Sequence, residues 1–309
     1  MASNLMKVVA SSVAIAGKAG NAIRLIMKSG DLGVIDKAVK DGNFDPQTAA
    51  DRTAQAIIVA SLSKQFPDLL IVGEEEGCDA VSEEMLVEDP DKDVLKQNCP
   101  DNFKNLKLSD LVVWVDPLDG TKEFTEGHVE HVTVLIGISA HGKAIAGVVH
   151  QPFFSNEGRT IWGVVGLGAF GVSATVSPPG RRIITTTKSH MTDNVQQTID
   201  AMKPDKVLRT GGCGYKVLQV IEGIADAYVF ATPGTKKWDT CAPEAVLIAM
   251  GGMLTDIRNE RIDYSKTAPK YFMNWTGILG TASEHDSYAS KIPESIRESL
   301  KMKFDEKTK

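Results

Sequence analysis

A Ser-Pro-Pro-Gly break at residues 177–180 separates two parts of the sequence that differ in their pattern of apolar residues. Two prolines and a glycine can continue neither a helix nor a strand, because proline lacks the backbone N–H and glycine is conformationally free. A chain of 309 residues is long enough for two packed domains. We therefore predict an N-terminal domain over residues 1–176 and a C-terminal domain over residues 181–309.

The part before the break predicts two helices and then a sheet. Apolar residues recur every three or four positions over residues 5–27 and 48–66, which is the spacing of amphipathic helices. A buried strand is predicted at 69–73, and a run of short apolar segments separated by Gly-containing turns fills residues 111–172. Residues 77–109 are charged and predict a surface insertion with one short helix. An α+β domain with one antiparallel-rich sheet is expected.

Beyond the break, predicted strands and helices alternate, which is typical of an α/β domain. The strands are predicted at about 182–187, 206–210, 227–231 and 253–257, and the helices at about 192–202, 214–223, 239–250 and from about 284 onward.

Charge and cysteine content limit the possible partners. The balance of 34 basic against 40 acidic residues, net −6, argues against a nucleic-acid partner, which requires a basic face. The longest apolar stretch, residues 132–138, is roughly a third of the ~20 residues of a membrane-spanning helix, and no signal-peptide pattern opens the sequence. Cys78, Cys99, Cys213 and Cys241 form no C-x-x-C pair and are interpreted as free thiols. We expect a cytoplasmic protein without a nucleic-acid, membrane or obligate protein partner.

The strongest local signal is WVDPLDGTKEF at residues 114–124, where a hydrophobic strand ends in two carboxylates. Asp116 and Asp119 are followed at once by Gly120 and Thr121. A small glycine lets backbone N–H groups approach an anion closely, so metal and phosphate can meet at this strand end. The same string alone also fits an acidic turn that caps the following helical turn.

Acidic residues also mark three other predicted element ends. Glu74 ends the strand at 69–73, and Asp239 stands where a helix N-cap is expected, with Pro243 in the first turn. Thr48 and Asp51 lie three apart at the start of the second helix. Each also has a structural interpretation. Glu74 fits a solvated acidic turn, Asp239 fits a lone helix cap, and Asp51 fits an acidic first helical turn that the helix dipole favours.

Together, these strings resemble the lithium-sensitive, magnesium-dependent phosphomonoesterase superfamily, which includes inositol monophosphatases and fructose-1,6-bisphosphatases. Within it, the closest likeness is to the bisphosphate nucleotidase branch. The resemblance implies a layered αβαβα sandwich of the sugar-phosphatase type, with the active site between the two domains. It spans nearly the whole chain, through DPQTAAD (45–51), VGEEE (72–76), WVDPLDGTKEF (114–124), IITTTKSH (183–190) and WDTCAPEAVLIAMGG (238–252).

The resemblance also implies roles for single residues. About two or three Mg²⁺ ions would be held by hard oxygen ligands, and Li⁺ would inhibit. Asp51 would orient Thr121, whose hydroxyl helps to deprotonate a metal-bound water. The implied metal ligands are Glu74, Asp116, Asp119, Asp239 and the carbonyl of Leu118, and the implied substrate-binding residues are Gly120, Thr121, Thr187, His190, Gly212 and Lys216.

The residue types themselves support part of the implied substrate-binding set. Glycines at 211–214 before a helix offer N–H donors for a phosphate, and Lys216 adds a positive charge. Each also has a plain structural interpretation: a tight turn for the glycines, a surface residue for His190 and a solvated helix charge for Lys216.

The activity implied is magnesium-dependent removal of the 3'-phosphate from adenosine 3',5'-bisphosphate and from its 5'-phosphosulfate analogue. The tripeptide at 122–124 favours this over an inositol phosphate phosphatase, which would use the same metal site. A non-catalytic nucleotide-binding protein would not need the Asp51 and Thr121 pair. An oxidoreductase built on the glycines at 166–171 is disfavoured, because no long helix follows them.

Overall fold

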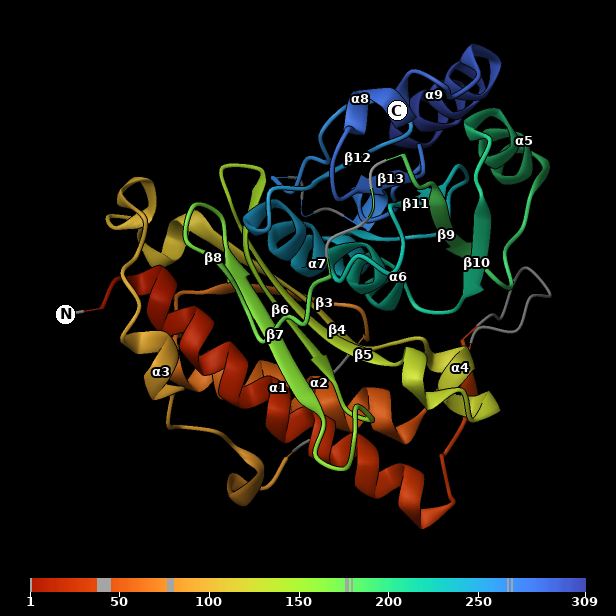
Figure 1. Cartoon of the computed structure of the whole chain (residues 1–309). Coiled ribbons are helices and arrows are strands. Elements are labelled where there is room, and N and C mark those ends of the chain that lie inside the picture. The colour runs from red at the N-terminus through yellow and green to blue at the C-terminus, as the bar shows by residue number, and fades with distance from the viewer. Residues whose placement is uncertain are drawn as a thin grey trace.

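The computed structural model describes residues 2–37, 46–76, 81–175, 178, 180–265, 267 and 269–309. In these residues, helices and sheets are stacked in the order α, β, α, β, α (Figure 1). The predicted layered αβαβα sandwich is therefore confirmed. Within the described ranges, no helix is long and apolar enough to cross a membrane.

One outer layer consists of α1 (Asn4–Ser29) and α2 (Ala49–Gln65), which pack against each other and against the first sheet. Both helices were predicted from their apolar spacing. Gly30 ends α1 in the left-handed region, at φ 80°, and Thr48 caps the N-terminus of α2 with its side chain.

The first sheet of the described residues has six strands in the order β3-β4-β5-β6-β7-β8. β3 pairs parallel with β4, and each later pair is antiparallel, which agrees with the antiparallel-rich sheet that was predicted. Successive residues of β4 face opposite sides: Val113 and Val115 enter the core under α1 and α2, whereas Trp114 enters the core on the other face. The strands are β3 (Leu70–Gly73), β4 (Leu111–Asp119), β5 (Thr133–Ala140), β6 (Lys143–Gln151), β7 (Arg159–Val164) and β8 (Gly168–Phe170).

The middle layer is formed by α6 (Cys213–Ile221) and α7 (Lys237–Ala249), between the two sheets (Figure 1). α7 lies directly on β5 and β6, because Gly137 and Gly147 leave room for its backbone. A Cβ atom added to Gly147 would stand 2.1 Å from the carbonyl oxygen of Ala242. The position of α7 is thus set by close backbone approach.

The second sheet has five strands in the described residues, in the order β10-β9-β11-β13-β12. β9, β10 and β11 are parallel, and β13 pairs antiparallel with β11 and β12. Its strands are β9 (Ile183–Thr187), β10 (Lys206–Thr210), β11 (Ala227–Phe230), β12 (Met253–Thr255) and β13 (Ile278–Thr281), and the outer helices beyond it are α5 (Asp193–Met202), α8 (His285–Ala289) and α9 (Glu294–Thr308).

The C-terminal part differs from the sequence prediction in detail. Strand β13 was not predicted, and the single helix expected from about residue 284 is two helices, because Pro293 interrupts it just before α9. α7 begins two residues earlier than predicted. Asp239 is therefore its third residue rather than its N-cap, and Pro243 lies inside the helix rather than in its first turn.

The remaining elements are short. β1 (Ile35–Asp36) pairs with β2 (Pro46–Gln47), α3 (Lys92–Leu95) lies in the charged insertion as predicted, and α4 (Thr121–Glu126) follows β4. Single 3₁₀ turns are found at Glu83–Met85, Asp101–Phe103, Leu108–Asp110, Val129–His131 and Pro269–Tyr271.

The core between the two sheets draws residues from both predicted domains. Trp114 of β4 packs edge-on against Tyr264, with ring centroids 6.1 Å apart. The domain boundary stays a prediction, since residues 176, 177 and 179 lie outside the described residues, as do Asp45 and Cys78. The other cysteines, Cys99, Cys213 and Cys241, are free thiols.

Candidate active site

A cavity of about 520 Å³ lies where β4, α4, α6 and α7 meet. Its wall brings together residues that are up to 193 positions apart in the sequence, from both sides of the predicted domain boundary. Of the predicted site residues, it is lined by Asp119, Gly120, Thr121, Thr187, His190, Gly212, Lys216 and Asp239. The other predicted residues, Asp51, Glu74, Asp116 and Leu118, are not part of this lining.

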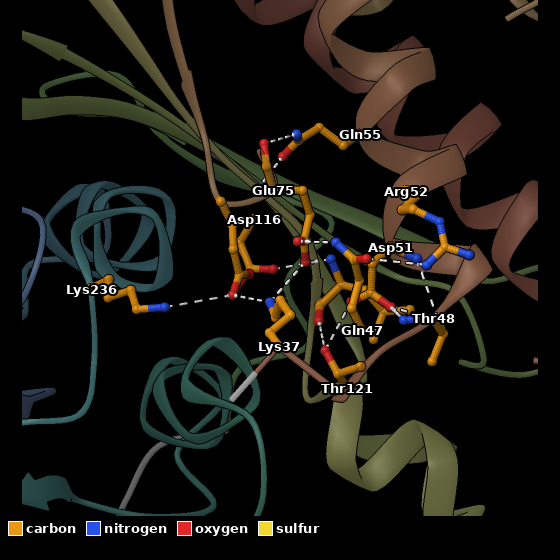
Figure 2. Close-up of polar contacts among 12 residues, drawn as sticks. Lys37, Gln47, Thr48, Asp51, Arg52, Gln55, Glu75, Asp116, Thr121 and Lys236 are labelled. Carbon is orange, nitrogen blue, oxygen red and sulfur yellow. Dashed lines mark hydrogen bonds and ion pairs between the residues drawn. The ribbon is translucent and has the colours of Figure 1, made fainter. Parts of the chain in front are cut away.

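Asp51 and Thr121 are in contact, as the resemblance implied (Figure 2). The hydroxyl of Thr121 lies 2.9 Å from Oδ1 of Asp51 and 3.1 Å from the carbonyl oxygen of Leu118. The other oxygen of Asp51 accepts hydrogen bonds from the backbone N–H and the hydroxyl of Thr48, at 2.8 and 2.5 Å. Burial raises the pKa of Asp51 to about 6, although the bonds from Thr48 and Thr121 oppose the rise. The catalytic roles of this pair stay predictions.

A bulge in β4 brings Asp116 and Asp119 to the same region. Asp116 pairs with Leu135 of β5 and Asp119 with Thr133, so three steps along β4 match two steps along β5. Without the extra residue, the two side chains would face opposite sides of the sheet. The backbone N–H of Leu118 donates to Oδ1 of Asp116, at 3.0 Å, and so holds the turn.

Asp119 is bound to the N-terminus of α6. Its carboxylate accepts hydrogen bonds from the backbone N–H groups of Cys213 and Gly214, both at 2.8 Å, and from the hydroxyl of Thr133 at 2.9 Å. These two N–H groups were expected to be open to a phosphate, and that expectation was wrong. Burial raises the pKa of Asp119, while the Lys216 charge and these hydrogen bonds oppose the rise.

Asp116, Asp239 and Glu74 form an acidic group in which Asp116 is buried and the other two are partly exposed. Burial, followed by the charges of Glu74, Asp239 and Asp119, raises the pKa of Asp116 well above its usual value, and its carboxyl group hydrogen-bonds that of Asp239. Burial and the charges of Glu74 and Asp119 raise the pKa of Asp239 to about 7. Asp239 also accepts a hydrogen bond from the backbone N–H of Lys236, at 2.8 Å.

Two lysines that sequence reasoning missed compensate this acidic group. The ammonium groups of Lys37 and Lys236 lie 3.4 and 3.8 Å from a carboxylate oxygen of Glu74. Burial raises the pKa of Glu74, and these two charges oppose the rise. Lys236, three residues before Asp239, could have been noticed by its position in the sequence. Lys37 could not, because no motif marks it.

Glu75 was also missed as a member of the site. Its carboxylate forms an ion pair with the ammonium of Lys37, at 3.0 Å, and accepts a hydrogen bond from the side-chain amide of Gln47. Gln55 of α2 holds its backbone through two hydrogen bonds, at 2.9 and 2.6 Å (Figure 2). The run of acidic residues after β3 indicated that this segment contributes to the site. It did not indicate that Glu75 is the buried one.

The donor set suits a hard divalent cation. Carboxylate and carbonyl oxygens are the ligands that Mg²⁺ prefers. Each of two neighbouring carboxyl groups, as in Asp116 and Asp239, disfavours ionisation of the other, and a bound cation would relieve this repulsion. As the side chains stand, no three acidic, histidine or cysteine groups of the described residues converge on one point. The fit therefore rests on charge and donor chemistry, and the ligand roles stay predictions.

The same cavity is lined by the predicted substrate residues. Lys216 is only 5 % exposed, and its ammonium donates to the carbonyl oxygens of Gly212 and Thr210, at 2.5 and 3.4 Å. The alternative of a solvated helix charge is therefore wrong. Burial lowers its pKa. The hydroxyl of Thr187 accepts from the backbone N–H of His190 at 3.1 Å, which fixes the turn after β9.

Comparison with known proteins agrees with this arrangement. A sequence profile of the Inositol monophosphatase family matches residues 4–297. The 3'(2'),5'-bisphosphate nucleotidase 1 of Homo sapiens is 51% identical, with 96% of this chain and 97% of that protein covered. The protein of the same name from Dictyostelium discoideum is 43% identical, with 92% and 96% covered.

Solved structures share the fold at lower identity. The extragenic suppressor protein suhB from Bartonella henselae has a TM-score of 0.68 at 22% identity, covering 94% of this chain and 99% of that chain. Full-length sequence similarity and the common fold lead to one assignment: the chain belongs to the inositol monophosphatase family.

Proposed function

We propose that this enzyme hydrolyses the 3'-phosphate of adenosine 3',5'-bisphosphate to give AMP and inorganic phosphate, and acts likewise on 3'-phosphoadenosine 5'-phosphosulfate. The observation that carries the proposal is the 51% identity to a bisphosphate nucleotidase over 96% of the chain. Identity to the putative inositol monophosphatase 3 of Drosophila melanogaster is 33%. An inositol phosphate phosphatase on the same metal site is therefore the second candidate.

The cavity is lined by both acidic and basic side chains, which suits a substrate with two anionic groups. Asp119 and Asp239 are acidic lining residues, and Lys216 and His190 are basic ones. The scissile 3'-phosphate belongs beside the acidic residues, where metal ions would offset its charge. The 5'-phosphate requires protein donors of its own, and Lys216 supplies positive charge there in a protein of net charge −6.

The acidic residues would bind metal ions. Glu74, Asp116, Asp119, Asp239 and the carbonyl of Leu118 would hold Mg²⁺, which when bound neutralises phosphate charge and acidifies the attacking water. Li⁺ inhibits as a small hard cation that competes for the same oxygen ligands. These cation effects rest on family membership and on the chemistry of the oxygen donors.

The protein residues handle the proton. Asp51, with a pKa of about 6, is mostly ionised at neutral pH and accepts the hydrogen bond of the Thr121 hydroxyl. The Thr121 oxygen is thereby oriented to accept a proton from water as the water oxygen attacks phosphorus, while its own proton passes to Asp51. The bond between phosphorus and the 3'-oxygen breaks, and that oxygen takes a proton from solvent as AMP leaves.

The reducing cytoplasm is the proposed location, since the described cysteines are free thiols. A small nucleotide is the proposed partner, and the net negative charge supports this choice over nucleic acid.

The test is a phosphate-release panel with adenosine 3',5'-bisphosphate, inositol 1,4-bisphosphate, inositol 1-phosphate and fructose 1,6-bisphosphate. Each assay is run with Mg²⁺, with Mg²⁺ plus millimolar Li⁺, and with a chelator. We expect the highest kcat/KM for the nucleotide, loss of activity in the chelator and inhibition by Li⁺. A higher kcat/KM for inositol 1,4-bisphosphate would establish the second candidate instead.

A further inference from the structure

The carboxylate of Glu123 lies in the wall of the active-site cavity and receives no hydrogen bond from any described residue. The residue is 5 % exposed. Its side chain lies between two glycines: a Cβ atom added to Gly211 would stand 2.0 Å from its Cδ, and one added to Gly120 would stand 3.7 Å from its Oε2. Glycine at position 211 thus makes room for this carboxylate.

Buried carboxylates are ordinarily hydrogen-bonded, because an unpaired one loses its hydration without replacement. Burial lowers the pKa of Lys216 and of His131, and the Glu123 charge opposes that shift in both. Neither side chain donates to Glu123, and the ammonium of Lys216 donates to Gly212 and Thr210. The open hydrogen-bonding capacity of Glu123 is therefore directed to a ligand in the cavity.

The proposed nucleotide substrate carries no cationic group, so the substrate group that Glu123 faces is an uncharged donor. A second phosphate is excluded at this place, because two anions would repel each other. Glu123 lines the same cavity as Asp119 and Thr121, where the scissile phosphate is proposed to bind. In a nucleoside 3'-phosphate, the uncharged donor next to that phosphate is the 2'-hydroxyl, whereas the adenine amino group lies at the far end of the molecule.

We propose that Glu123 determines specificity by accepting a hydrogen bond from the sugar hydroxyl adjacent to the scissile phosphate. This inference rests on the proposed nucleotidase function. It assigns to Glu123 the selection of ribose over deoxyribose substrates, because loss of the hydroxyl leaves a buried carboxylate unpaired in the complex.

The test measures kcat/KM for adenosine 3',5'-bisphosphate and for 2'-deoxyadenosine 3',5'-bisphosphate. The wild-type enzyme, Glu123→Ala and Glu123→Gln are compared. Glu126→Gln is the matched control, since it makes the same change in the same helix at a side chain that is 43% exposed and outside the cavity lining. The ratio of kcat/KM between the two substrates in Glu123→Ala is the baseline. It measures the effect that the 2'-hydroxyl has on the reactivity of the 3'-oxygen without Glu123.

We expect the ribose-to-deoxyribose ratio of the wild type to exceed that of Glu123→Ala by about 10-fold or more, the size of a charge-assisted hydrogen bond. Glu123→Gln keeps an uncharged acceptor, so its ratio should lie between those of the wild type and Glu123→Ala. The ratio of Glu126→Gln should equal that of the wild type. Equal losses on both substrates would mean that Glu123 only supports the fold, and would overturn this inference alone.

Two further outcomes keep the conclusions separate. If Glu123→Ala does not fold, the near-isosteric Glu123→Gln serves in its place, and a ratio equal to that of the wild type overturns the inference. If the wild type does not hydrolyse adenosine 3',5'-bisphosphate at all, the proposed function fails and this inference fails with it.

Discussion

Replacement of Gly147 by alanine should move α7 and with it Asp239. The new Cβ atom would stand 2.1 Å from the carbonyl oxygen of Ala242 and 2.8 Å from its Cα and carbonyl carbon. All three are backbone or Cα atoms, so no side-chain rotation relieves the contact. Helix and strand must separate by about 1 Å to restore normal van der Waals contact.

This separation should affect both stability and activity. Overpacking a closely packed contact costs about 1–3 kcal/mol of unfolding free energy. Ala242 is three residues after Asp239, so the shift reaches the candidate site within one turn of α7. A displacement of about 1 Å can reduce turnover about 100-fold. Thermal unfolding and phosphate release at saturating Mg²⁺ measure the two effects.

Gly17→Ala is the matched control, because Gly17 lies inside α1 with nothing within 4 Å of an added Cβ atom. Alanine should stabilise that helix by about 0.5–1 kcal/mol and leave activity unchanged. A Gly147→Ala enzyme with wild-type melting temperature and turnover within twofold would refute the claim that this contact positions Asp239.

Three further changes are predicted from the site and from the core beneath it. Burial raises the pKa of Glu244 to about 8 from 4.5, so the unfolded chain loses this proton first and stability falls as pH rises between these values. Glu244→Gln, which still accepts from the Tyr264 hydroxyl, should therefore gain roughly 3 kcal/mol relative to wild type between about pH 5.5 and 7.5 in urea unfolding; a pH-independent difference would contradict this. Thr121→Val should lower kcat by about 100-fold or more because Asp51 loses its partner, whereas Thr121→Ser should stay within about 10-fold; equal effects would argue against a role for the hydroxyl. Lys216→Ala should raise KM for adenosine 3',5'-bisphosphate by about 10-fold or more and change that for adenosine 3'-phosphate much less; equal increases would show that Lys216 does not contact the second phosphate.

Most elements could be predicted because their apolar residues repeat with a clear period. The 26-residue α1 and the strands of the first sheet have such patterns. Strand β13 was not predicted, because its four residues are too few to show a period and form a strand by pairing with β11 and β12. The start of α7 was misplaced because aspartate is favoured both at the N-cap and in the first turn, where Asp239 actually lies.

The candidate site was predicted unevenly for a similar reason. Acids at strand and helix ends can be recognised locally, and eight predicted residues line one cavity. Contacts between distant segments cannot be recognised in this way. For example, Asp119 accepts hydrogen bonds from the N–H groups of Cys213 and Gly214, which lie 94 and 95 positions further along the sequence. Glu123 was visible only as part of a tripeptide that favours one branch of the family.

The two faces of β4 also bear on how the protein unfolds. Val113 and Val115 belong to the core under α1 and α2, whereas Trp114 belongs to the core shared with the second sheet. Loss of either core therefore exposes one face of the same strand. We expect the two sheets to melt in one cooperative transition, and a fragment ending near residue 176 to aggregate through its uncovered Trp114 face.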